Sequence, residues 1–288
     1  MQRSYSEGPQ FRESLFRLLD GVFEDLSDRV VQQEAVGLDW EGASTPFVDT
    51  DGDRFVAHVG VIELDLVMDG QPIRVGSMHA VATDPEYRRQ GRCRRLVEEA
   101  LAFCDARYQT VELATELEGV YVGHGFRRIS ESRFIDDRPG GGASARKSRI
   151  LNLLMPKDRE LLLELLSTRA PVSRRLGVVR DSTAFLFASA SRPLRYIPDL
   201  NCVVFGELKE NRVLELWDVI APSMPTLADL VAYLPERWRR LEVYFTPDQL
   251  DAELETEAHV LDTDGPDLLM VRGPYPSGPL MLPRTART

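Results

Sequence analysis

Residues 81–96, VATDPEYRRQGRCRRL, constrain the fold more than any other stretch of the chain. A β-type run ends at Asp84-Pro85, a basic turn with one glycine follows, and the apolar spacing beyond it predicts an amphipathic helix. A strand, a turn and a helix in this order direct free backbone N–H groups into the space above the turn. Arginines at positions 88, 89, 92, 94 and 95 add full positive charges there. The stretch therefore predicts an anion site that suits a pyrophosphate.

This turn differs from the common phosphate-binding loops, because the GxxxxGK[ST] pattern is absent and a single glycine does not make a dinucleotide fingerprint. It resembles motif A of the GNAT acyl-CoA-dependent N-acyltransferases, whose loop reads Arg/Gln-x-x-Gly-x-Gly/Ala. Residues 88–93, RRQGRC, supply the first arginine and the central glycine, with Cys93 where the family has glycine or alanine. We interpret Cys93 as a small packing residue rather than a nucleophile. The alternative for the whole stretch is a structural turn with a solvated arginine face.

A second motif follows about thirty residues later. Residues 121–126, YVGHGF, resemble motif B of the same family, Tyr-x-x-x-Gly-Phe. The segment between the motifs predicts an amphipathic helix through residue 104 and then a strand over residues 110–115. We interpret His124, inside motif B, as structural. The resemblance covers residues 11–134, a little under half of the chain.

The resemblance and the periodicity together predict an α/β (α+β) fold with a mixed, mostly antiparallel sheet flanked by helices. Strands are expected at residues 54–66, 73–82 and 126–134, with a hairpin turn at Asp69-Gly70. The length of 288 residues suggests two domains. We predict a GNAT-like domain at residues 1–138, a Gly-, Ser- and Pro-rich linker at 139–147 and a second α/β domain at 148–288.

The second half repeats the expected order of the first. Helices are expected at residues 150–166 and 227–234. Strands are expected at residues 184–188, 201–208, 213–220, 240–245 and 267–272. Where the first half has its arginine-rich loop, this half has residues 221–225, APSMP, whose two prolines lack N–H donors. We therefore predict a degenerate GNAT-like domain without a cofactor loop. An unrelated α+β domain is the alternative.

The resemblance implies specific roles at the cofactor site. Val81, Ala82 and Thr83 would line the pantetheine and meet the thioester oxygen through their backbone. Side chains of Arg88 and Arg89 would contact phosphate groups. Backbone N–H groups would hold the pyrophosphate, and these belong to Gln90, Gly91, Arg92, Cys93 and Arg94.

Two further residues carry the expected acid–base chemistry. Tyr121 matches the tyrosine that protonates the departing thiolate in the family, and the alternative is a core tyrosine packed near Phe126. Glu116, just after the strand at residues 110–115, is our candidate for the base that deprotonates the amine. Glu63, Asp65 and His79 are alternatives to Glu116, and transfer through water needs no single residue.

Composition limits the function classes. Most of the net charge of −11 lies in the first half, which argues against a primary nucleic-acid role. The acidity is either a solvated surface or an acceptor site that attracts a cationic amine. Three cysteines without metal or disulfide spacing predict no metal and a cytoplasmic location. No apolar run approaches the length of a membrane span, and no secretory leader is evident.

The resemblance implies an N-acyltransferase that moves an acetyl group from acetyl-CoA to a primary amine, and the acidic first half favours a cationic small molecule as acceptor. A protein amine is an alternative acceptor. A non-catalytic acyl-CoA-binding or interaction module is the alternative from another class. A homodimer is a further possibility, in which the second half would mediate the contact or wall the acceptor site.

Overall fold

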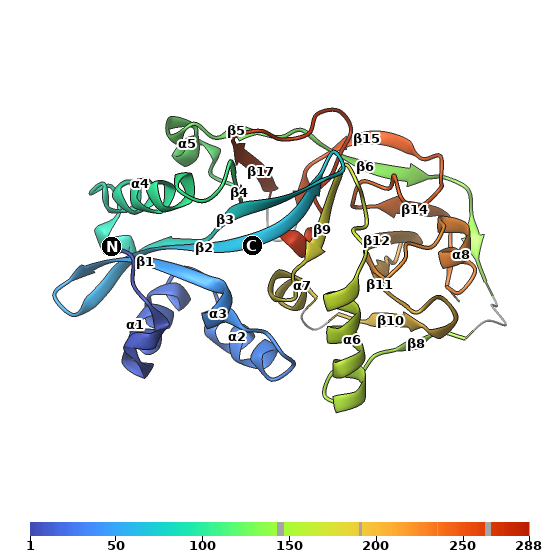
Figure 1. The fold of residues 1–288 in the computed structure, drawn as a ribbon, viewed down its shortest axis with the longest axis horizontal. Helices are drawn as coiled ribbons and strands as arrows, with labels where there is room; N and C mark the ends of the chain where they lie inside the picture. Colours follow the sequence, from blue (N-terminus) through green and yellow to red (C-terminus); the bar gives the residue numbers. More distant parts are fainter. Residues whose placement is uncertain (143–146, 190–191, 235, 263–265, 288) are drawn as a thin grey trace.

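The computed structural model describes residues 1–142, 147–189, 192–234, 236–262 and 266–287. Two sheets with helices around them lie side by side along the long axis of the molecule (Figure 1). The fold class expected from the sequence, a mixed and mostly antiparallel sheet with helices in each half, is confirmed. Of the linker predicted at residues 139–147, positions 143–146 lie outside the described residues.

The first sheet is built around a long hairpin. Strands β2 (Arg54–Met68) and β3 (Gln71–Thr83) are antiparallel, and the turn between them uses positive φ at Asp69 and Gly70, as the sequence predicts. Strand β1 (Ser44–Asp51) lies outside β2, and β4 (Thr110–Thr115) is parallel to β3. Strand β9 (Leu176–Arg180) continues the outer edge of β2 beyond β1.

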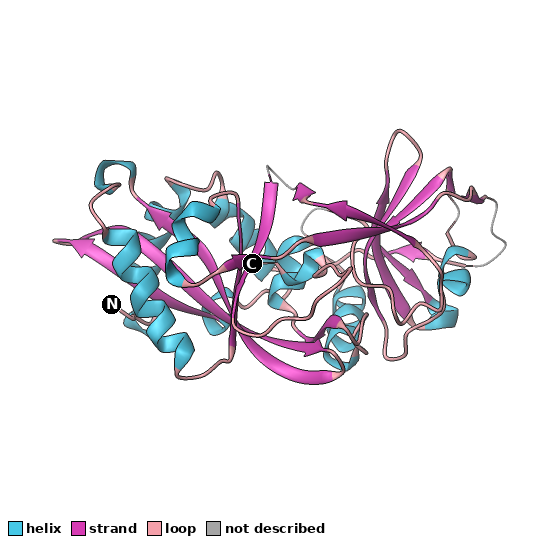
Figure 2. Cartoon of the chain, turned by 90° about the horizontal axis from the view of Figure 1, so that it is seen from above, coloured by secondary structure: helices cyan, strands magenta, loops and turns pink. Residues whose placement is uncertain are grey.

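Helices cover both faces of this sheet (Figure 2). Alternate residues of β2 such as Val59 and Val61 pack under α4 (Arg92–Asp105), whose apolar face is fully buried. On the opposite face lie α1 (Pro9–Asp20), α2 (Leu26–Glu34) and the short α3 (Trp40–Ala43). Because helices pack on both faces, the positions of β2 and β3 are fixed, and so are the positions of the residues at the ends of these strands.

The second sheet repeats the pairing pattern of the first. Strands β11 (Cys202–Leu208) and β12 (Val213–Ile220) form an antiparallel hairpin, and β12 is parallel to β14 (Arg240–Val243). Strands β10 (Leu194–Ile197) and β8 (Arg149–Ile150) extend the other edge. The hairpin followed by one parallel neighbour is the arrangement of β2, β3 and β4, so the two halves share a fold. Helices α6 (Pro156–Thr168), α7 (Thr183–Ala188) and α8 (Leu227–Val231) belong to this half.

The two halves exchange a strand. Strand β17 (Pro266–Arg272) belongs to the second half of the sequence but lies in the first sheet, where it pairs with β4. Strands β5 (Arg127–Arg128) and β16 (Leu261–Asp262) also pair with β17. Conversely, β6 (Glu131–Asp136) lies in the second sheet between β14 and β15 (Glu255–His259). The division predicted at residues 138 and 148 therefore does not coincide with the division between the sheets.

Two expected elements are wrong in detail. The strand predicted over residues 126–134 is divided into β5 and β6, which enter different sheets. The strand predicted at residues 184–188 is the helix α7, because the Asp181 carboxylate accepts the backbone N–H groups of Thr183 and Ala184 and so starts a helix.

Two short strands form a separate small sheet. Strands β7 (Gly140–Gly141) and β13 (Arg237–Trp238) pair beside the second sheet.

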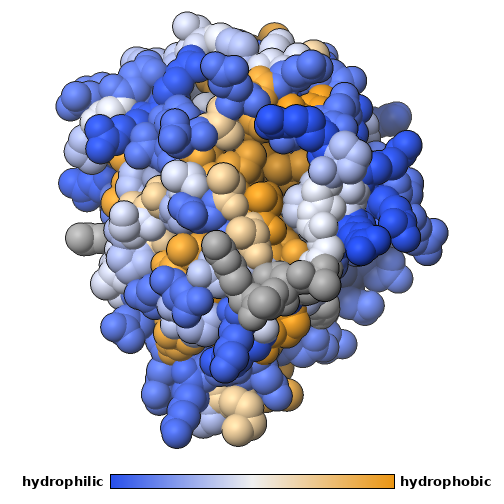
Figure 3. Space-filling model, turned by 90° about the vertical axis from the view of Figure 1, so that its right-hand side faces the viewer, coloured by the Kyte–Doolittle hydropathy of each residue, from blue (hydrophilic) through white to orange (hydrophobic). Residues whose placement is uncertain are grey.

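The face at the second-half end of the molecule shows a hollow with hydrophobic surface, surrounded by hydrophilic side chains (Figure 3). Among the described helices, none is both long enough and apolar enough to cross a membrane.

Candidate active site

A cleft opens where β3 and β4 separate. The two strands pair only from Val75–Thr110 to Ser77–Glu112. Beyond that point they diverge, and a cavity with a volume of about 780 Å³ lies between their ends. Parallel strands that separate leave backbone N–H and C=O groups facing the gap, where a bound molecule can use them.

A bulge in β3 produces the divergence. His58 pairs with Ala82 and Gly60 with His79, so one extra residue of β3 lies between these pairs. Ala80 takes up the irregularity with a φ of 47°, and its carbonyl oxygen lies 2.8 Å from Nδ1 of His58. Gly60 is required here, because a Cβ at that position would lie 2.3 Å from Nε2 of His79.

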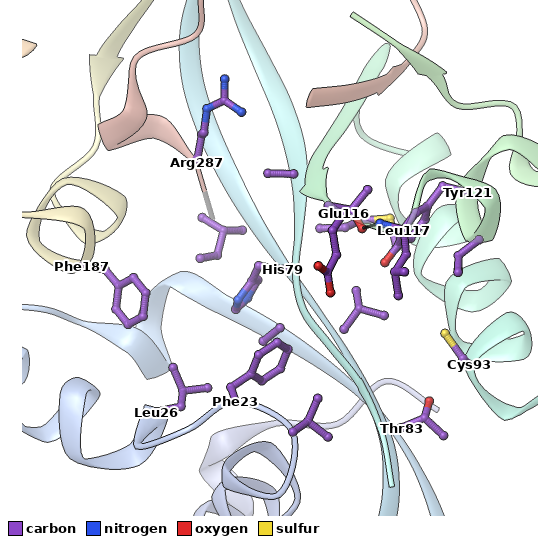
Figure 4. Close-up of a pocket in the computed structure, with 18 of the residues that line it drawn as sticks. Phe23, Leu26, His79, Thr83, Cys93, Glu116, Leu117, Tyr121, Phe187 and Arg287 are labelled. Carbon is purple, nitrogen blue, oxygen red and sulfur yellow. Dashed lines mark hydrogen bonds between the residues drawn. The ribbon is translucent and has the colours of Figure 1, made fainter. Parts of the chain in front are cut away.

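The structure brings many of the predicted residues to this cleft (Figure 4). Ala82 is the exception on β3, because its side chain is buried in the core. Five of the loop residues, Arg89, Gln90, Gly91, Arg92 and Arg94, are not among those that line the cleft. Six predicted site residues do line it, and these are Val81, Thr83, Arg88, Cys93, Glu116 and Tyr121.

The loop before α4 has the conformation of an anion site. Gly91, at the N-cap of α4, has a φ of 77°. Among the described residues, no side chain caps the first turn of the helix. An uncapped helix N-terminus offers N–H donors and a positive potential. A Cβ on Gly91 would meet no atom within 4 Å, so its positive φ and the open space are what favour glycine there.

The arginines of the loop divide into two groups. Arg92 and Arg95 both form ion pairs with Asp49, at 2.9 Å, and Arg94 pairs with Glu98 on the same helix. Arg88 instead donates from Nε to the carbonyl oxygen of Thr83, and within the described chain neither Arg88 nor Arg89 forms an ion pair. Arg88 and Arg89 are therefore the loop arginines without an ion pair in the described chain, and their contact with phosphate stays a prediction.

The comparison of sequences settles the family of this half. Residues 10–125 match the profile of an acetyltransferase (GNAT) domain. This part of the chain is a GNAT domain. The resemblance seen in the two motifs is thereby confirmed. No curated protein matches the chain by sequence.

Solved structures resemble the whole arrangement. A probable N-acyltransferase from Enterococcus faecalis V583 has a TM-score of 0.61 at 14% identity, over 94% of this chain and 71% of that one. A GCN5-related N-acetyltransferase from Kribbella flavida has a TM-score of 0.56 at 16% identity, over 92% and 69%. Eis1 from Mycobacterium abscessus has a TM-score of 0.54 at 15% identity, over 94% and 71%. At these identities the likeness concerns the fold, and it extends over both halves.

Tyr121 holds a protonated phenol beside the cleft. It ends the short helix α5 (Glu118–Tyr121), is 5% exposed and makes an edge contact with Phe126 at 5.9 Å between ring centroids. Burial, followed by the neighbouring Cys93, raises the pKa of the Tyr121 phenol above its ordinary value. A phenol in this state can donate a proton at neutral pH.

Cys93 and Thr83 lie side by side at the GNAT cleft. Burial raises the pKa of the Cys93 thiol, which therefore stays protonated despite its position in the first turn of α4. A hydrogen bond between the Cys93 thiol and the buried hydroxyl of Thr83 opposes this rise. A hydroxyl and a small thiol side by side suit the polar, narrow chain of a pantetheine.

Glu116 has the best position among the candidate bases. Its exposed side chain points into the cleft from just beyond the end of β4 (Figure 4). Glu63 and Asp65 do not line the cleft. His79 does line it, but burial lowers its pKa to about 3, so it is a weak base. His79 instead makes a buried hydrogen bond to Ser44, at 2.8 Å.

The sequence reasoning missed the far wall of the cleft. Phe23 comes from the connection of α1 to α2, and Leu26 begins α2. Trp40 comes from α3 and Phe187 from α7 of the second half. The apolar run around Phe187 was a signal, but it was assigned to a strand. Phe187 shows that the second half forms part of the wall of this cleft.

Proposed function

We propose that the chain transfers an acetyl group from acetyl-CoA to the primary amine of a small molecule. The observation that carries the proposal is the single cleft that joins Thr83, Arg88, Glu116 and Tyr121 at the separated ends of β3 and β4. A GNAT domain uses an acyl-CoA donor. The acetyl group as the donor's acyl group, and the small molecule as acceptor, are the further steps of this proposal.

The residues divide the reaction among themselves. Glu116 removes a proton from the ammonium, directly or through water, and the free nitrogen attacks the carbonyl carbon of the thioester. Backbone groups of residues 81–83 hold the oxygen on which negative charge develops, a contribution of roughly 3 kcal/mol for an oriented N–H donor. When the carbon–sulfur bond breaks, Tyr121 gives its proton to the departing thiolate, and the second proton that the nitrogen loses returns to the Tyr121 phenolate through water. The products are an amide and free CoA.

Binding and turnover are tested separately. Thermal unfolding is followed with acetyl-CoA, CoA or ATP, and stabilisation by both CoA species supports the loop as their site. Release of the CoA thiol is then measured with a panel of primary amines. We expect Tyr121→Phe to bind acetyl-CoA normally and to lower kcat about 100-fold. Tyr196→Phe, in the second sheet, is the matched control and should keep full activity.

Other outcomes select other functions. CoA binding without turnover of any amine favours a non-catalytic acyl-CoA-binding module, and turnover only of peptide amines favours a protein N-acetyltransferase. A cytoplasmic location and a homodimer stay predictions of the sequence, which fractionation and light scattering address.

A further inference from the structure

The side of the cleft opposite the cofactor loop is aromatic. Phe23 and Phe187 approach it from different halves of the chain, and both lie near His79 (Figure 4). Trp40 is 5% exposed and packs edge-on against His79 at 5.1 Å between ring centroids. Leu26 completes this wall. We call these five residues, Phe23, Leu26, Trp40, His79 and Phe187, the aromatic wall.

The charges around the cleft do not favour a polycation. Among the described residues that line it, Glu116 is the one carboxylate, whereas Arg29, Arg88 and Arg287 are cationic. The guanidinium of Arg29 lies over the ring of Phe187, 4.7 Å from its centroid. Arg287 is paired with Glu131 and Asp267, and Arg88 is the group proposed for phosphate, so Arg29 is the cation left on the acceptor side. A molecule with several ammonium groups would therefore meet one favourable charge and one repulsive charge. The acidic character of the first half thus lies mostly outside the cleft.

Helix α7 holds Phe187 in place. The Asp181 carboxylate accepts from the N–H groups of Thr183 and Ala184, and Phe185 and Leu186 are fully buried. The next residue, Phe187, is only half-buried and faces the cleft, where α2 packs against α7. An aromatic side chain held on a rigid element and left partly open is the usual form of a ligand-contacting residue.

We infer that the acceptor is an arylalkylamine, that is, one primary amine joined by a short chain to an aromatic body. The inference rests on the proposed function and names its substrate class. The aromatic body packs between Phe23 and Phe187 on the aromatic wall, and the amine extends to Glu116 and the ends of β3 and β4. Selectivity for the acceptor thereby comes partly from the second half, through Phe187.

The test compares acceptors under saturating acetyl-CoA. kcat/KM is measured for phenethylamine, tryptamine, spermidine, kanamycin and a lysine-containing peptide. We expect the two arylalkylamines to exceed the other three by at least tenfold. Phe187→Ala should raise the KM for tryptamine by tenfold or more and leave the KM for acetyl-CoA unchanged. Phe187→Leu keeps an apolar side chain and should recover part of the loss.

One further variant tests the aromatic wall from another element, and a second one controls for changes in KM caused by the loss of any aromatic side chain. Phe23→Ala removes the facing ring from another element and should raise the same KM, even if α7 tolerates no change. Tyr196→Ala removes a half-buried aromatic side chain outside the cleft and should change neither KM. Melting curves establish that each variant is folded.

The outcomes separate this inference from the proposed function. If spermidine, kanamycin or the peptide is the best acceptor, acetyl transfer stands and the arylalkylamine inference is overturned. If arylalkylamines are preferred but neither phenylalanine variant changes their KM, the placement on the aromatic wall is overturned. If no amine is acetylated although CoA binds, the proposed function fails and the inference falls with it.

Discussion

Nδ1 of His58 lies 2.8 Å from the carbonyl oxygen of Ala80, the residue with positive φ at the bulge of β3. The ring nitrogen donates to that oxygen and so stabilises the irregular conformation that moves the end of β3 away from β4. Nε2 of the same ring is buried and has no hydrogen-bond partner among the described residues. The imidazole is therefore held in a neutral form at the base of the cleft.

Acid should destabilise the protein through His58 and His79. Burial lowers the pKa of His58 to about 4 and that of His79 to about 3, so the unfolded chain binds these protons more readily than the folded one. Their contribution is fully present above pH ~6.5 and is lost as the pH falls toward 4. Each histidine should remove about 1.4 kcal/mol of unfolding free energy per pH unit in this range.

Urea denaturation at pH 7, 6 and 5 measures this dependence. His58→Asn keeps a donor near Ala80 without a titrating ring and should give a shallower loss of stability with acid than the wild type. His124→Asn, outside the cleft, is the control and should keep the wild-type slope. Equal slopes for wild type and His58→Asn would contradict the assignment of acid sensitivity to this ring.

Gly60→Ala should destabilise the fold by about 1–3 kcal/mol, because inserted atoms in a packed core displace their neighbours. The new Cβ would lie 2.3 Å from Nε2 of His79, which Ser44 and Trp40 hold from the other side. Gly119→Ala is the control, since a Cβ there meets no atom within 4 Å. The double variant Gly60→Ala/His79→Ala should be less destabilised than the sum of the single ones. Additive effects would show that the contact is not the cause.

Gly91→Asp should weaken CoA binding by at least tenfold. The positive φ of 77° strains a side chain at this position, and a carboxylate would repel a pyrophosphate at the N-terminus of α4. Gly91→Asn is the matched variant, because asparagine tolerates positive φ better and carries no charge. Calorimetric titration with CoA should rank the affinities as wild type, then Asn, then Asp. An unchanged affinity in Gly91→Asp would remove the loop from the cofactor site.

The parts of the site that the sequence predicts well are local in the chain. Arg88, Gly91 and Tyr121 belong to two short motifs, and a motif fixes both the residue type and its backbone conformation. The alternation of β2 and the Asp69-Gly70 turn likewise depend only on neighbouring residues. Family and fold class therefore follow from short stretches of the sequence.

The parts that the sequence does not predict depend on contacts between distant segments. The apolar pattern of β17 predicts a strand, but nothing in it tells that its partner is β4 of the other half rather than β14. The run at residues 184–188 is short and apolar, so its periodicity fits a strand as well as a helix. Phe187 lies at the cleft because α7 packs against α2, a contact between distant segments that the sequence does not reveal.

Glu112 should make the protein less stable as the pH rises. Its side chain is 1% exposed on β4, and burial raises its pKa to about 8, although Arg287 and a hydrogen bond from Tyr275 oppose the shift. Arg287 also pairs with Glu131 and donates to the carbonyl oxygen of Asp267. Because the folded chain binds this proton more tightly than the unfolded one, the stabilisation is full below pH ~4.5 and is lost as the pH rises through 8.

Glu112→Gln tests this expectation, since glutamine can accept from Tyr275 but does not titrate. The unfolding free energy of the wild type minus that of the variant should fall by on the order of 2 kcal/mol between pH 5 and pH 8. Glu118→Gln, exposed on α5, should show no such trend. A difference that stays constant with pH would mean that Glu112 is already ionised in the folded protein. In that case the charge of Arg287 would stabilise the ionised carboxylates of Glu112 on β4 and of Glu131 together.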